Sequence, residues 1–179
     1  EGYELVRRLD RRCGKGGGGV LVFALIEHAA SVTHIEDGSD TDERVWILIH
    51  ALTGPVLLCA WYRPPGDGES EVISRFGEEF HRLRGQALGA IVVGDINPHH
   101  VSWLKLSSHT AASATELLSI VKEAGLTQHV KVPTRGPHLL DLVLSDMKTS
   151  AKVVCKIADH SVVLATTKLQ LPHNVTVAR

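Results

Sequence analysis

Short apolar runs of strand length alternate along this chain with two segments of helical periodicity, and this alternation restricts its fold more than any other feature. Apolar residues recur at helical spacing over residues 69–84 and again over residues 111–124, so each segment predicts an amphipathic helix. Strands are predicted for several apolar runs, of which 153–157 is the weakest: 20–26, 44–50, 55–62, 90–93, 140–144, 153–157 and 161–167. Because residues 52–54 join two strands as a hairpin while helices separate others, the pattern predicts a mixed α/β sheet protein.

The length of 179 residues is enough for one domain with a substantial core. Hydrophobic residues make up 44% and charged residues 22%, which is typical of a globular protein. We find no internal repeat and no second domain, so residues 1–179 are interpreted as a single domain. No apolar run approaches the roughly 18 residues that a membrane span requires, and no membrane partner is predicted.

Charge and cysteine content narrow the class of protein further. The chain has 19 basic and 20 acidic residues, which argues against a globally basic nucleic-acid binder. A nuclease is not excluded, because it needs only a local basic rim around an acidic metal site. The three widely spaced cysteines form neither a disulfide framework nor a metal motif, and this pattern indicates reduced thiols in an intracellular protein.

Polar side chains stand directly after the apolar run of residues 90–93. Asp95 and Asn97 lie two positions apart, so in an extended backbone both project to the same side. A carboxylate and an amide arranged in this way can hold a hydrolytic water and a phosphate oxygen near a hard cation. The alternative is an Asx-type turn that closes the strand, and the local sequence alone favours neither interpretation.

A further carboxylate, Asp141, lies inside the apolar run of residues 140–144. Burying an unpaired carboxylate is costly, which predicts a partner such as His160, whose imidazole Asp141 could orient. Asp159 and His160 directly precede the strand predicted at residues 161–167. Together they could provide a partner for a metal ion or a histidine and, in addition, a proton donor. The alternatives are an outward-facing Asp141 and a solvated Asp159-His160 loop.

Tyr62 ends the strand of residues 55–62 beside a proline turn, a position that by itself more often serves packing than catalysis. In chain order, however, Tyr62, the Gly-Asp-Ile-Asn segment at 94–97, Asp141 and Asp159-His160 resemble the motifs of the endonuclease/exonuclease/phosphatase superfamily. Further segments are similar to its LINE-type (non-LTR) retrotransposon endonuclease branch: Gly-Gly-Gly-Val at 17–20, Tyr-Arg-Pro-Pro at 62–65, the extension at 95–103 and Val-Pro-Thr-Arg at 132–135. The resemblance covers about residues 3–169.

This resemblance implies a two-sheet β-sandwich flanked by helices, in the four-layer α/β/β/α arrangement of AP-endonuclease and DNase I-like proteins. Family members open with a strand carrying an Asn, followed by a second strand that ends in a metal-binding Glu. Neither strand has a counterpart here, and Glu1, Glu4, Glu27 and Glu36 stand in the wrong context to replace that Glu. We therefore expect residues 1–179 to form a single domain that lacks its first two strands.

Carried over by position, the resemblance implies a phosphoester hydrolase that uses Mg²⁺ or Mn²⁺. Asp95 would activate or position the attacking water, and Asn97 would orient it. His160 would stabilise the charge that develops on the scissile phosphate, while Asp141 would hold the imidazole in its productive tautomer. Tyr62 would donate a hydrogen bond to the phosphate or to the leaving oxygen.

The resemblance also implies roles for residues around this centre. Asp159 would support the metal side of the site. Thr134 and Arg135 are similar to the family's loop that approaches the DNA backbone, where an arginine suits phosphate contact. His99 and His100 could line the DNA groove, although a role at a helix entry or in the core is equally consistent.

The leading interpretation is a DNA-nicking endonuclease of a non-LTR retrotransposon, acting in the nucleus, with a reverse transcriptase domain downstream in the full-length protein. One alternative is a catalytically inactive remnant of that domain, which the missing Glu favours because Mg²⁺ prefers near-octahedral oxygen coordination. The other alternative is a phosphomonoesterase of the same superfamily.

Overall fold

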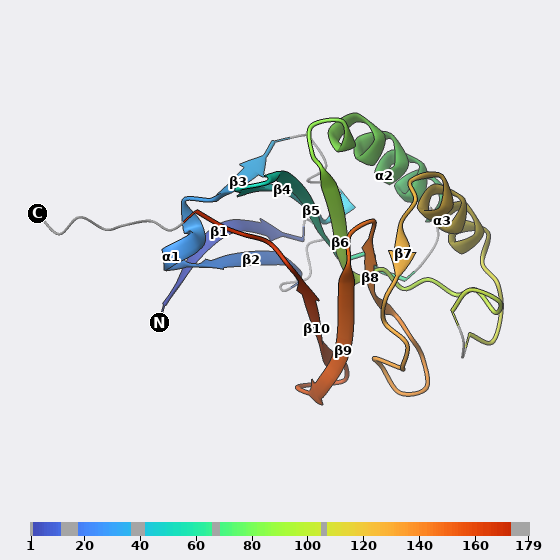
Figure 1. Ribbon diagram of the computed structural model, residues 1–179. Coiled ribbons are helices and arrows are strands. Elements are labelled where there is room, and N and C mark those ends of the chain that lie inside the picture. The colour runs from blue at the N-terminus through green and yellow to red at the C-terminus, as the bar shows by residue number, and fades with distance from the viewer. Residues whose placement is uncertain (1, 12–17, 37–41, 66–68, 105–106, 173–179) are drawn as a thin grey trace, which may run out of the picture.

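The computed structural model describes residues 2–11, 18–36, 42–65, 69–104 and 107–172. Figure 1 shows helices α2 (Glu69–Arg84) and α3 (Ala112–Glu123) on one side of a central sheet and two β-hairpins on the other side. Both helices lie where the apolar periodicity predicts them. In the described part of the chain, no helix combines the length and the apolar character needed to cross a membrane.

The central sheet has six strands in the order β3-β4-β5-β6-β8-β7. Their bounds are β3 Val32–Ile35, β4 Arg44–Ala51, β5 Gly54–Trp61, β6 Gly89–Asp95, β7 Thr127–Gln128 and β8 Asp141–Ser145. β4 and β5 form the predicted antiparallel hairpin, whereas β5 and β6 run parallel because α2 carries the chain back across the sheet. β8 runs antiparallel to β6, so the last residue of β6 and the first residue of β8 lie side by side at the same end of the sheet.

Aromatic side chains fill the space between the central sheet and the helices. Trp46 and Trp61 point from β4 and β5 toward α2, where the ring of Phe76 stacks on Trp61 at a centroid distance of 4.6 Å. Leu117 and Val121 of α3 join the same core. Burial of such side chains stabilises a fold by roughly 1.5–3 kcal/mol each, which makes this layer a rigid base for the sheet edges.

The second layer consists of two separate hairpins. One pairs β1 (Tyr3–Asp10) with β2 (Gly19–Leu25), and the other pairs β9 (Thr149–Lys156) with β10 (Ser161–Thr167). The first hairpin packs on β4 through Leu9, Val45 and Ile47. The second packs on the main core through Ala151, Val153 and Val163. The expectation of an α/β protein with a central sheet flanked by helices is confirmed.

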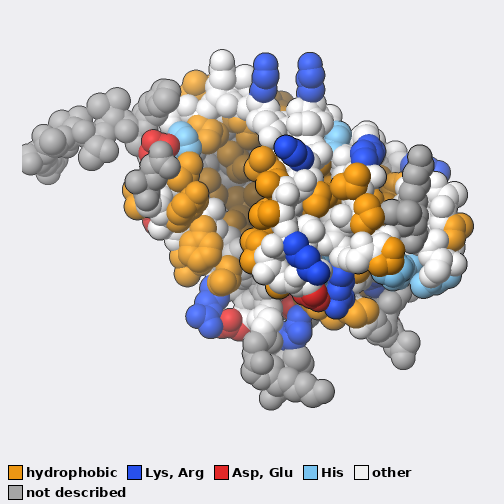
Figure 2. Space-filling model, turned by 90° about the horizontal axis from the view of Figure 1, so that it is seen from below, with side chains coloured by type: hydrophobic (Ala, Val, Ile, Leu, Met, Phe, Trp, Pro, Cys, Tyr) orange, Lys and Arg blue, Asp and Glu red, His pale blue; other side chains and the backbone are white. Residues whose placement is uncertain are grey.

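The two hairpins are not paired with each other among the described residues, and this leaves strand edges and apolar surface open. Leu58, Ala60 and Val93 of the central sheet stay partly exposed, and Figure 2 shows an apolar hollow on this side of the molecule. Large apolar side chains also lie exposed on and beside the first hairpin: Tyr3, Leu5, Leu21, Phe23 and Ile26. Such edges and patches favour association with another strand or apolar surface.

Some elements were not predicted from the sequence. β1, β3, β7 and the short helix α1 (Ile26–Ala29) are absent from the predictions, and the strand predicted at 20–26 ends one residue earlier because Ile26 begins α1. In β1, charged residues interrupt the apolar positions, so neither alternation nor a continuous apolar run marks it. The sequence also predicts a glycine-rich turn at residues 14–19, and most of this turn lies outside the described residues.

Candidate active site

Three of the predicted site residues meet at one end of the central sheet, where its strands begin or finish. Asp95 is the last residue of β6 and Asp141 the first of β8, and these two residues are direct neighbours in the sheet register. His160 immediately precedes β10, whose hairpin packs over this part of the sheet. Strand ends far apart in sequence thus bring two carboxylates and an imidazole together on a rigid support.

His160 lies between the two carboxylates. Its Nδ1 is 2.9 Å from Asp141 Oδ2, the hydrogen bond expected from the sequence, and its Nε2 is 3.8 Å from Asp95 Oδ2. With Nδ1–H donating to Asp141, Nε2 is left facing Asp95 and the space beside it. The potential ligand atoms of the three residues all lie within 4.8 Å of one another, and in the described residues this is the one such group of three or more.

Asp95 occupies an unfavourable setting for a charged carboxylate. Burial, followed by the neighbouring charge of Asp141, raises the pKa of Asp95 to about 6. The charges of His160 and Arg135 and a side-chain hydrogen bond from Asn97 act in the opposite direction but do not offset burial. One oxygen, Oδ1, is buried and has no hydrogen-bond partner among the described residues.

This arrangement fits a divalent cation. A buried carboxylate oxygen without a partner is costly unless it meets a positive charge, and oxygen donors are the ligands that Mg²⁺ and Mn²⁺ prefer. Asp95 would hold the ion through Oδ1, with Asp141 adding negative charge beside it. Asp159 lies outside this cluster, since its side chain is 66% exposed and pairs with Arg135 at 2.8 Å.

The loop that carries Asp95 has a special backbone. Gly94 has a φ of 144°, and an added Cβ would lie 1.8 Å from the carbonyl oxygen of Trp61, so β5 and β6 approach too closely here for any side chain. Asn97 has a φ of 49°, and its buried side chain donates from Nδ2 to the carbonyl oxygen of Arg63 at 2.9 Å. Asn97 is thereby fixed beside Asp95, and the Asx-turn and functional interpretations of this segment are both compatible with its geometry.

Tyr62 stands at the neighbouring strand end and is held by two residues that the sequence did not single out as partners. Its backbone N–H donates to the carbonyl oxygen of Glu43 at 3.0 Å. Arg11 lies over the ring at 4.7 Å from its centroid and donates to Glu43 Oε1 at 2.7 Å. The hydrogen bond to Glu43, with a smaller one to Tyr62, raises the pKa of Arg11. Only the fold reveals this group, because Arg11 and Glu43 are 32 positions apart.

Thr134 is buried in the structure and does not lie on the surface, where a contact to DNA would place it. It is 2% exposed, and its Oγ1 accepts hydrogen bonds from the backbone N–H groups of Leu140 and Asp141, both at 3.1 Å. Its carbonyl oxygen accepts a hydrogen bond from the Ser161 N–H at 2.8 Å. The side chain therefore cannot reach DNA in this conformation. Thr134 instead joins the start of β8, which carries Asp141, to the start of β10 beside His160.

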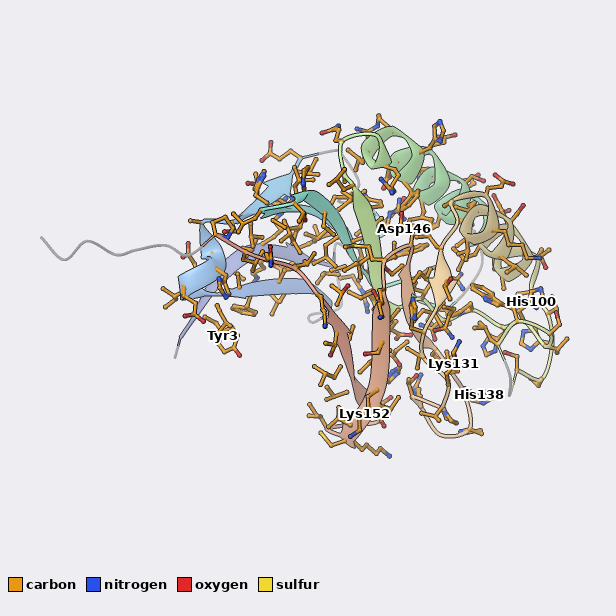
Figure 3. All side chains as sticks on the ribbon, viewed as in Figure 1. Tyr3, His100, Lys131, His138, Asp146 and Lys152 are labelled. Atoms are coloured by element: carbon orange, nitrogen blue, oxygen red, sulfur yellow. The ribbon has the colours of Figure 1, made fainter. Side chains whose placement is uncertain are left out.

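The other predicted DNA contacts divide between the rim and the interior. Arg135 lies on the rim, with its side chain 48% exposed. His100 is buried, and its Nδ1 accepts a hydrogen bond from the Trp103 N–H at 3.2 Å, which favours the interior role over the groove role. His99 is half-buried and stacks on His109 at a ring-centroid distance of 4.7 Å. Figure 3 shows His100 in the loops beside α3, away from the hairpin that carries Lys152.

Comparisons with known proteins place these features in a family. A family model described as endonuclease-reverse transcriptase matches residues 56–164, the part of the chain that contains Tyr62, Asp95, Asn97, Asp141 and His160. A search among curated proteins found no match.

Solved structures support the same fold. The endonuclease domain of TRAS1, a telomere-specific non-LTR retrotransposon, is 19% identical, with a TM-score of 0.65 over 92% of this chain and 79% of that one. An endonuclease/exonuclease/phosphatase family protein from Bacteroides thetaiotaomicron is 14% identical, with a TM-score of 0.57 over 90% and 72%. A Cimex nitrophorin bound to NO is 13% identical, with a TM-score of 0.51 over 95% and 75%. Proteins of different chemistry therefore share the architecture, and the chemistry has to be argued from the site.

Proposed function

This chain belongs to the endonuclease-reverse transcriptase family of the endonuclease/exonuclease/phosphatase superfamily, and we propose that it is a metal-dependent phosphodiester hydrolase that nicks DNA. The observation that carries the proposal is the meeting of Asp95, Asp141 and His160. His160 is oriented by Asp141, and Asp95 keeps a buried oxygen that has no hydrogen-bond partner in the part of the chain that the structure describes. A fold alone would not require these three side chains to converge.

The residues divide the work of phosphodiester hydrolysis by their positions. Asp95 would hold a divalent cation through its buried Oδ1, and such an ion would supply positive charge beside the phosphate and lower the pKa of a bound water. Asp95 accepts the proton of the attacking water, and Asn97, fixed beside it, orients that water. Asp141 accepts the Nδ1–H of His160, so that a protonated Nε2 donates to a non-bridging phosphate oxygen. Tyr62, held by Arg11 and Glu43, donates to the leaving oxygen.

Arg135 extends the proposal to DNA. It is exposed on the rim of the site, close enough for its charge to lower the pKa of Asp95. A guanidinium there can contact a backbone phosphate next to the scissile one and so position the strand without reading its sequence. The family description also names a reverse transcriptase, and we include in the proposal a polymerase domain elsewhere in the full-length protein and action in the nucleus.

We propose in addition that two further strands complete the second layer between β2 and β10. The support is the lack of pairing between the two hairpins among the described residues and the apolar surface left beside them. An added pair of strands would satisfy both edges and cover Leu58, Ala60 and Val93. If they also bring a carboxylate, they would strengthen metal binding at Asp95.

The test is nicking of supercoiled plasmid by this chain, and by a form that includes the two strands, in Mg²⁺ with EDTA as the metal-free control. We expect the longer form to convert supercoiled to open-circular DNA, and Asp95→Ala and His160→Ala to abolish this. His81→Ala, an exposed histidine on α2, serves as the matched control and should nick normally. Hydrolysis of a small phosphomonoester by a folded longer form that leaves plasmid intact would refute the nuclease proposal, and inertness toward both substrates would identify a remnant.

A further inference from the structure

Arg63 connects the end of β5 to the segment that carries two of the proposed catalytic residues, Asp95 at the end of β6 and Asn97 in the turn that follows. Its Nε donates to the carbonyl oxygen of Ile96 at 2.7 Å and its Nη2 to that of Asn97 at 2.8 Å. Its backbone N–H donates to the carbonyl oxygen of Asp95 at 2.9 Å, and its own carbonyl oxygen accepts from Asn97 Nδ2 at 2.9 Å. One residue, 3% exposed, thus holds three consecutive residues of the loop through four hydrogen bonds.

The loop needs such a partner because its conformation is unfavourable by itself. Asn97 is left-handed, with a φ of 49°, a region that costs a non-glycine residue about 1 kcal/mol or more. The turn leads the chain out of the β6 ladder, so the carbonyl oxygens of Ile96 and Asn97 must find donors elsewhere. Leaving a buried carbonyl oxygen without a donor costs roughly 1–3 kcal/mol. Arg63 supplies both donors from one planar group.

The local sequence presents Arg63 to this loop. Pro64 restricts the residue before it to an extended backbone, so the chain leaving β5 continues alongside the end of β6. The side chain then needs only to fold over residues 96 and 97. A lysine could not reproduce the contact, because its ammonium is a compact, strongly hydrated charge, whereas the guanidinium offers donors in a fixed fork.

We infer that Arg63 is a positioning residue for the proposed hydrolysis. It fixes the backbone of residues 95–97 and, through that backbone, the directions of the Asp95 carboxylate and the Asn97 amide. It is buried behind the loop and acts without contacting the substrate. This inference rests on the proposed nuclease function for its kinetic consequence, but its structural consequence can be measured independently.

The kinetic test compares Arg63→Lys with Arg84→Lys. Arg84 is the matched control, because its guanidinium also donates to two backbone carbonyl oxygens, those of Ala87 and Leu88, at the opposite end of the sheet. In the nicking assay we expect Arg63→Lys to lower kcat about 100-fold with little change in KM, as for a misplacement of about 1 Å. Arg84→Lys should lose stability and keep its kcat. An unchanged kcat in Arg63→Lys would overturn the inference.

NMR of the Asn97 side-chain amide tests the structural step even if the wild-type protein proves inactive, in which case only the nuclease proposal fails. The wild-type amide protons should exchange slowly with solvent, because Nδ2 is bonded to the Arg63 carbonyl. Arg63→Lys should abolish this protection and shift the backbone signals of residues 95–97, and Arg84→Lys should do neither. If Arg63→Lys does not fold, the scalar coupling across the hydrogen bond from Arg63 Nε to the Ile96 carbonyl decides in the wild-type protein, and its absence would refute the inference.

Discussion

Asp95 places a charge where the fold disfavours one, and its removal should therefore stabilise the protein. The side chain is 18% exposed, and burial together with Asp141 raises its pKa from 3.8 to about 6. A raised carboxyl pKa means that the native state binds the proton more tightly than the unfolded chain does. The resulting stability is fully present below pH 3.8 and is lost as the pH rises through 6.

The expected magnitude follows from the size of this shift. A rise of about two units, at about 1.4 kcal/mol each, costs the native state about 3 kcal/mol once Asp95 is fully ionised. Asp95→Asn removes the charge while keeping the shape of the side chain. In metal-free buffer at pH 7.5 the variant should gain about 2–3 kcal/mol in its free energy of unfolding, and at pH 3.5 it should gain nothing.

Urea unfolding in EDTA, with the wild-type protein and the variant compared at each pH, measures this difference. Asp146→Asn is the matched control, because Asp146 is 16% exposed but is paired with Arg84 at 2.6 Å, at the other end of β8 (Figure 3). That variant leaves the Arg84 guanidinium without its negatively charged partner, so it should be less stable than the wild-type protein at pH 7.5. The reasoning fails if Asp95→Asn is less stable than the wild-type protein at pH 7.5, or if its gain does not change with pH.

Three other variants test the contact to His160, the hydrogen bonds of Thr134 and the exposed apolar surface of β2. Asp141→Asn should lower the nicking rate about 10²- to 10⁴-fold while leaving DNA affinity unchanged, because the neutral amide, which can also donate, no longer enforces the Nδ1–H tautomer of His160 or stabilises its charge; a smaller fall in rate would contradict the orienting role. Thr134→Val leaves two backbone N–H groups without their acceptor and should cost roughly 1–3 kcal/mol in urea unfolding, with Thr115→Val on the exposed side of α3 as a near-neutral control. The double change Leu21→Lys and Phe23→Lys places charge on the exposed side of β2 and should reduce binding of the dye ANS without altering the far-UV circular dichroism; unchanged dye binding would mean that this surface is already covered.

The sequence predicts well those elements whose signal is local. α2 has the predicted bounds of residues 69 and 84, because its apolar spacing reports directly which face is buried. β4 and β5 were predicted as a hairpin from two apolar runs and a short turn. β1 lies in the second layer with much of its outer side exposed, so packing demands little of its side chains, and its charged residues conceal it. The missing signal reflects the strand's position rather than an unusual sequence.

The site divides in a similar way. Asp95, Asn97, Asp141 and His160 follow from strand-end chemistry and motif order, because the fold puts such residues at one edge of a sheet. The role of Thr134 could not be predicted, since a threonine in a loop is equally suited to bind a phosphate or two backbone N–H groups. The difference depends on which way the loop folds, and that is a tertiary property.

Several costs to stability meet within four residues of this loop. Asp95 keeps a buried oxygen without a partner among the residues described, Gly94 allows an approach that no other residue tolerates, and Asn97 is left-handed. Strain of this kind gathers at functional sites, where it is maintained because activity requires it. A remnant without activity would gain stability from almost any neutral substitution at Asp95. The presence of Asp95, which faces His160 and whose backbone is held by Arg63, is therefore consistent with the proposed hydrolase, and the nicking assay decides between it and a remnant.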